Sequence, residues 1–239
     1  FNLFAVEDIG AVTPALLSGY EVAIVAEMPL TPTQVTVFSD WVTAGGQLIA
    51  MDPDPDLAGL LGLVPAGGQL SEGYLLVDGA TPVGAGIVGE TMQFHGTAGL
   101  FSLDGAASLA TLYSSASNPT IYPAVTLNAV GPNGGQAAAF AYDLATSIVY
   151  TRQGNPAWEG QDRDGFPPVR SNDLFYGASE SDPQPDWVDL GKVDIPQADE
   201  QQRFLANLIL EMSRDHQPLP RLWYFPRGER AVVVLTGDD

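Results

Sequence analysis

The stretch EVAIVAEMPLTPTQVTVFSDWVTAGGQLIAM, residues 21–51, decides the fold. Its two short apolar runs, 21–27 and 47–51, have the length and composition of buried strands. Between them, Thr31 can act as an N-cap, and Gln34 completes a capping box with it. A strand, a helix and a second strand in this order form a βαβ unit. We therefore predict that the two strands are parallel and joined by a right-handed crossover.

The rest of the chain divides by composition. Residues 65–135 are rich in small residues and proline, and they predict β structure at four short apolar runs. These runs are 74–77, 92–94, 108–113 and 121–127. A further strand is predicted at 136–142, while 147–151 is either a strand or the end of a helix. Residues 152–190 show little periodicity, which is typical of a functional or ordered loop. Residues 197–212 form the best amphipathic helix of the chain.

Charge and cysteine content exclude several functions. The net charge is −20, and all nine basic residues lie at or after Arg152. So acidic a surface repels phosphate backbones, which excludes nucleic acid as the expected partner. The acidity is typical of a secreted or salt-tolerant protein, so we expect an extracytoplasmic location; divalent cation binding is the alternative interpretation. The chain has no cysteine, which excludes disulfides, thiolate metal sites and cysteine nucleophiles. No apolar run approaches the length of a membrane span.

The region 20–63 contains Trp-Val-x-x-Gly-Gly-x-Leu-Ile at the end of its helix and a later Leu-Leu-Gly-Leu. It resembles the class I glutamine-amidotransferase-like superfamily. The resemblance implies an α/β fold with a three-layer flavodoxin-like sheet, here with an added β-rich region at 65–135. The pattern from Pro123 to Asp143 is similar to non-catalytic branches, such as the trimerisation domains of some β-galactosidases. The amidotransferase reaction needs a cysteine nucleophile, so we expect the fold without that chemistry.

The chain ends in Val-Val-Val-Leu-Thr-Gly-Asp-Asp, residues 232–239. This ending resembles the opening motif of NodB-type polysaccharide deacetylases, in uncharacterised bacterial proteins that join the two domains. The resemblance implies that Asp238 is the general base and Asp239 a ligand of a divalent metal, both only in the full-length protein. The His-x-x-x-His motif that completes that metal site does not occur in this sequence. We therefore expect no cofactor in this chain, an amidotransferase-like domain at 1–217, and a linker with the first strand of a truncated deacetylase-like domain at 218–239.

Candidate ligand-binding residues gather in the loop after residue 151. They are Arg152, Asn155, Trp158, Arg163, Arg170, Asp173 and Tyr176. Flat aromatic rings and planar hydrogen-bonding groups are what a sugar ring or a carboxylate requires. In the alternative interpretation, the arginines neutralise local acids and hold the loop in place.

Three carboxylates, Glu27, Asp52 and Asp143, each follow an apolar run. In a parallel sheet they would meet at the carboxyl edge, where ligands bind, so Asp52 and Asp143 join the candidate binding residues. Alternatively, each of them only caps the next helix or turn.

Two other motifs are weaker. The Gly-x-Gly-x-x-Gly at 84–89 lacks the strand–helix context of a dinucleotide loop and predicts a turn. Residues 161–165 hint at a calcium loop, but Gly160 and Ser171 occupy positions that need acids, so a turn with ion pairs is favoured.

The sequence thus predicts a non-catalytic accessory or ligand-binding domain of a carbohydrate-active protein. Its expected partners are a glycan and the downstream domain of the same polypeptide. Two alternatives remain open: a hydrolase that acts on carbohydrate through the sheet-edge carboxylates, and an oligomerisation domain.

Overall fold

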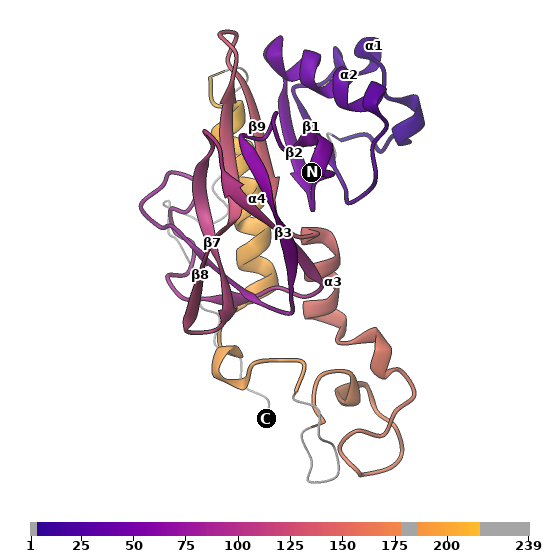
Figure 1. Ribbon diagram of the computed structural model, residues 1–239. Coiled ribbons are helices and arrows are strands. Elements are labelled where there is room, and N and C mark those ends of the chain that lie inside the picture. Colours follow the sequence, from indigo (N-terminus) through magenta and orange to yellow (C-terminus); the bar gives the residue numbers. More distant parts are fainter. Residues whose placement is uncertain (1–3, 178–185, 216–239) are drawn as a thin grey trace, which may run out of the picture.

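The computed structural model describes residues 4–177 and 186–215 (Figure 1). The α-helices are α1 (Pro14–Leu17), α2 (Pro32–Thr43), α3 (Leu144–Gln153) and α4 (Gln197–Ser213). The strands are β1 (Val22–Val25), β2 (Gln47–Met51), β3 (Leu63–Ser71), β4 (Tyr74–Val77), β5 (Met92–Gln93), β6 (Thr97–Leu103), β7 (Ala107–Ser115), β8 (Asn118–Val130) and β9 (Gly135–Phe140). Short 3₁₀ turns are η1 (Ile9–Ala11), η2 (Pro55–Leu57), η3 (Pro156–Trp158), η4 (Ser171–Leu174) and η5 (Leu190–Lys192).

Seven strands form one mixed sheet in the order β1-β2-β9-β8-β7-β4-β5. Strands β1, β2 and β9 are parallel, and every other pairing in this sheet is antiparallel. The predicted parallel pairing of the first two strands is confirmed, and the fold is α/β. The predicted β-rich stretch is divided between two sheets, because β4, β5, β7 and β8 continue the seven-stranded sheet whereas β3 and β6 form a two-stranded one. Register shifts between β7 and β8 mark bulges, which increase the twist of this half.

Helix α2 forms as its sequence predicts. Thr31 accepts a hydrogen bond from the backbone N–H of Gln34, and the Gln34 side chain accepts one from the N–H of Thr31. Phe38 and Val42 are buried against the sheet, and Gly45 ends the helix with a φ of 120°. A positive φ of this kind suits a residue without a Cβ, so glycine is required at this exit.

The side chains of β9 alternate between the two faces of the sheet, so neighbouring residues contact different layers. Phe140 contacts Phe204 of α4 edge to face, at 6.1 Å between ring centroids. Its neighbour Ala139 faces the opposite way, toward Leu63 of β3 and Phe101 of β6. Figure 1 shows α4 behind the sheet and β3 in front of it. The core therefore consists of a helical layer, the sheet, and the two-stranded ribbon β3–β6.

Several predictions need correction. After β2 the chain forms only the 3₁₀ turn η2 followed by turns. Residues 147–151, predicted as a strand or the end of a helix, are helical and belong to α3. Strands β3 and β6 are not predicted from the sequence, because a bulge between Pro65 and Gln69 breaks the alternation of apolar residues. The predicted linker and terminal strand at 218–239 lie outside the described residues. In the part of the chain that is described, no helix is both long and apolar enough to cross a membrane.

Candidate functional site

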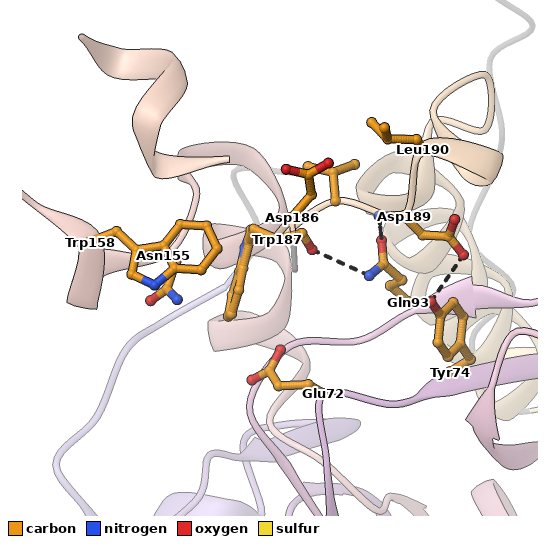
Figure 2. A pocket seen from close by; sticks show the side chains of 10 residues that line it. Glu72, Tyr74, Gln93, Asn155, Trp158, Asp186, Trp187, Asp189 and Leu190 are labelled. Carbon is orange, nitrogen blue, oxygen red and sulfur yellow. Dashed lines mark hydrogen bonds between the residues drawn. The ribbon is translucent and has the colours of Figure 1, made fainter. Parts of the chain in front are cut away.

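A cavity of about 600 Å³ lies between the edge of the sheet and the loops that follow α3 (Figure 2). Its volume is within the usual range for small-molecule sites. The described residues that line it are Glu72, Tyr74, Gln93, Asn155, Trp158, Asp186, Trp187, Val188, Asp189 and Leu190. Two of them, Asn155 and Trp158, belong to the predicted binding set.

Strand β4 and the edge strand β5 hold one wall of the cavity. Tyr74 and Gln93 face each other in this antiparallel pair. The Gln93 amide donates to the Trp187 carbonyl at 3.3 Å and accepts from the Asp189 N–H at 2.8 Å. The Tyr74 hydroxyl donates to Asp189 Oδ2 at 3.0 Å, and Figure 2 shows all three bonds. One side-chain amide therefore fastens the segment around Trp187 to the sheet edge.

The Trp187 ring is fixed on several sides. It stacks on the buried His95 imidazole, with 4.1 Å between centroids and 12° between planes. Its indole N–H donates to the Tyr150 carbonyl at 3.0 Å, and the Trp158 ring lies edge-on at 6.0 Å. An aromatic side chain held this way loses little further freedom when a ligand binds.

Glu72 enters the cavity from the tight turn between β3 and β4. Its backbone has a φ of 50°, which is uncommon for a residue other than glycine. One carboxylate oxygen accepts from the Gly96 N–H at 2.8 Å, and the other is 2.8 Å from His95 Nδ1. Gly73 allows the turn, because a Cβ there would lie 2.9 Å from the Phe94 ring. These contacts place an anchored carboxylate at the cavity wall.

The opposite wall comes from the loop after α3. Asn155 accepts from the Ala157 N–H and so begins the 3₁₀ turn that carries Trp158. The Arg163 guanidinium lies 3.3 Å from the centroid of the Trp158 ring, in a cation–π contact. Arg163 is buried but does not line the cavity. It supports Trp158 rather than facing a ligand in this cavity.

The three predicted sheet-edge carboxylates do follow parallel strands, at one edge of the sheet. Burial, together with the nearby Glu27 and Asp143 carboxylates, raises the pKa of Asp52 to about 6, although the Gly99 backbone amide partly offsets this. Asp52 also has a φ of 38°. Asp143 caps α3 by accepting from the Ala145 N–H, as the alternative interpretation predicted. None of the three lines the cavity.

The other predicted residues hold the loops together. Arg152 pairs with Asp199 of α4, and Arg170 pairs with Asp164 at 2.8 Å. Tyr176 is partly exposed and lies against Phe175. These contacts agree with the alternative interpretation, in which the arginines neutralise local acids.

Asp173 is buried, and its carboxylate accepts from three backbone N–H groups. The bond from Arg170, the strongest cause, lowers the pKa of Asp173. Asp162 and Asp164 lie near it, with ligand atoms within 4.8 Å of one another. Backbone amides bind Asp173 and Arg170 pairs with Asp164, which fits the predicted turn with ion pairs. The 84–89 segment is likewise a turn.

Glu72, Tyr74, Gln93, Trp187 and Asp189 line the cavity and are not predicted by sequence reasoning. Three of them, Glu72, Tyr74 and Gln93, lie on or beside β4 and β5, in short runs whose polar residues carry no motif. The sequence offers one indication of this site: Trp187 is flanked by Asp186 and Asp189. Asp238 and Asp239 lie outside the described residues.

No family model and no curated protein matches this chain. Solved structures with some likeness include an exo-β-1,4-mannosidase from Opitutaceae bacterium strain TAV5, with 20% identity, a TM-score of 0.43, and coverage of 56% of this chain and 23% of that one. A β-galactosidase from Rahnella sp. R3 has 21% identity, a TM-score of 0.42, and coverage of 57% and 23%. A cytoplasmic protein from Salmonella typhimurium LT2 has 12% identity, a TM-score of 0.46, and coverage of 62% and 70%. The chain thus spans less than a quarter of either glycosidase.

Proposed function

We propose that this chain is a non-catalytic, glycan-binding accessory domain of a carbohydrate-active protein. The observation that carries the proposal is the cavity in which Trp158 and Trp187 meet amide and carboxylate side chains. A tryptophan ring offers an apolar face to the C–H groups of a sugar, while amides and carboxylates can bind its hydroxyls. The fixed position of Trp187 adds support, because a preorganised wall costs little ordering entropy on binding.

We also propose a superfamily for the fold and a second domain for the full-length protein. Parallel β1, β2 and β9 with the helix α2 support a flavodoxin-like, amidotransferase-like origin for the fold. Without a cysteine, the nucleophile of that superfamily is missing. In the full-length protein, a NodB-type deacetylase-like domain would follow, with Asp238 as base and Asp239 as metal ligand. The divalent metal would belong to that domain, which is the proposed intramolecular partner.

Calorimetric titration of the purified chain with chitin and β-1,4-glucan oligomers tests the binding function. We expect saturable binding with a change in tryptophan fluorescence. Trp187→Ala should abolish it, while the control Ile121→Ala, which removes an exposed side chain of β8, should not. If no glycan binds, the proposed function is wrong.

A hydrolase acting through sheet-edge carboxylates is the second candidate, favoured by Asp52. A carboxyl with a pKa of about 6 can donate a proton near neutral pH. Exposed Glu27 would be the second group, because Asp143 is engaged in capping α3. Glycoside hydrolysis by the purified chain that is lost in Asp52→Asn would establish this function in place of the first.

A further inference from the structure

The charged side chains that line the cavity are acidic. Three of its lining side chains are carboxylates, Glu72, Asp186 and Asp189, and none of the described lining residues is lysine or arginine. Arg163 lies on Trp158, Lys192 pairs with Glu90 at 2.9 Å, and the buried His95 lies with its Nδ1 2.8 Å from the Glu72 carboxylate. Carboxylates next to aromatic faces form an environment that attracts a cation and repels an anion.

The Asp189 carboxylate is held in place by neutral hydrogen-bond donors. Asp189 accepts from the Tyr74 hydroxyl and from the Gly191 N–H, at 3.0 and 2.8 Å. Glu72 accepts from the Gly96 N–H, and its other carboxylate oxygen lies 2.8 Å from His95 Nδ1. Burial, followed by the hydrogen bond to Asp189 and the charge of Asp189, raises the pKa of Tyr74 to about 12. Each carboxylate oxygen has a second lone pair that can accept from a ligand.

We propose that the cavity selects sugars that carry a free amine, such as the glucosamine units of chitosan, over neutral, N-acetylated and acidic sugars. The inference rests on the proposed glycan-binding function and names its ligand class. The ammonium group would lie against Glu72 and Asp189, while the sugar ring packs on a tryptophan. An uncharged acetamide gains no such ion pair, and a uronic acid is repelled.

The test is a calorimetric comparison of chitosan, chitin and cellulose hexamers on the same protein, at a mildly acidic pH that keeps the amines protonated. We expect the glucosamine hexamer to bind about tenfold more tightly than the other two. Asp189→Asn and Glu72→Gln should each lower its affinity about three- to tenfold and leave the chitin hexamer unaffected. Asp40→Asn and Glu21→Gln remove the same charge at exposed positions and serve as matched controls.

Each outcome separates the two proposals. If no hexamer binds, the glycan-binding function itself fails. If chitin or cellulose binds as tightly as chitosan, only the amine selectivity is wrong. An equal loss of chitosan affinity in the control variants would mean non-specific attraction to an acidic protein, and would overturn the selectivity. Spermidine binding as tightly as the glucosamine hexamer would overturn the sugar assignment. Thermal unfolding of each variant verifies its fold, and Glu72→Gln replaces Asp189→Asn if the latter does not fold.

Discussion

Replacing Asp52 with asparagine should stabilise the protein at neutral pH. The pKa of Asp52 is raised from 3.8 to about 6, first by burial and then by the nearby Glu27 carboxylate. The shift of about two units corresponds to about 3 kcal/mol at most, at 1.36 kcal/mol per unit. Asp52 is only partly buried, so solvent screening reduces this to about 1–2 kcal/mol. Asparagine keeps the shape of the side chain and tolerates its positive φ.

The pH dependence has a definite sign. A carboxyl whose pKa is higher in the folded state than in the unfolded one favours folding while it is protonated. This contribution is fully present below about pH 3.8 and is lost as the pH rises through about 6. The free energy of unfolding of Asp52→Asn minus that of wild type should therefore increase by about 1–2 kcal/mol between about pH 4 and about pH 8.

Urea denaturation followed by tryptophan fluorescence measures this difference at each pH. Asp40→Asn removes an exposed carboxylate on α2 and is the matched control for the loss of one charge. Glu27→Gln should reduce the effect, because its charge is the second cause of the shift. A difference for Asp52→Asn that is constant, or that falls as the pH rises, would refute the reasoning.

Three further variants test the packing. Gly135→Ala would place a Cβ 1.8 Å from the Val42 carbonyl oxygen, so urea denaturation should show a loss of about 1–3 kcal/mol, and unchanged stability would contradict the close contact of α2 with β9. Tyr142→Phe removes a buried hydroxyl that donates to Gln201 at 2.9 Å, so thermal unfolding should show a loss of about 1 kcal/mol, and an unchanged Tm would show that this bond contributes nothing. Asp173→Asn weakens three backbone hydrogen bonds, so limited proteolysis of its loop should be faster at neutral pH. Because the pKa of Asp173 is lowered, its stabilisation is lost only as the pH falls through that low value, and equal cleavage rates at neutral pH would rule out this role.

Local chemistry made much of the fold predictable. Strand 47–51 coincides with β2, and Thr31 begins α2 with the capping box that its sequence predicts. The ribbon β3–β6 was not predictable, since its bulge interrupts the apolar alternation on which strand prediction depends. The extent of the sheet was also not predictable, because the pairing of β9 with β2 and β8 joins segments that are distant in the sequence.

The candidate site was also predictable only in part. Asn155 and Trp158 were predicted to bind ligand, and they do line the cavity, because a loop rich in aromatic and amide groups is recognisable by composition. The arginines of that loop belong to the same predicted set; in the structure Arg152 and Arg170 pair with acids and Arg163 lies on Trp158. Sequence position cannot distinguish these roles, since both require the same residue types.

The sequence by itself determined the βαβ unit, the α/β class, the lack of a cysteine nucleophile and the acidic charge. Each of these follows from nearest-neighbour spacing or from composition. Only the tertiary structure brought Glu72 and Gln93 of the sheet edge against Trp158 and Trp187, from loops far along the chain. A cavity is formed by contacts between such segments, and those contacts depend on how the layers pack rather than on any local pattern.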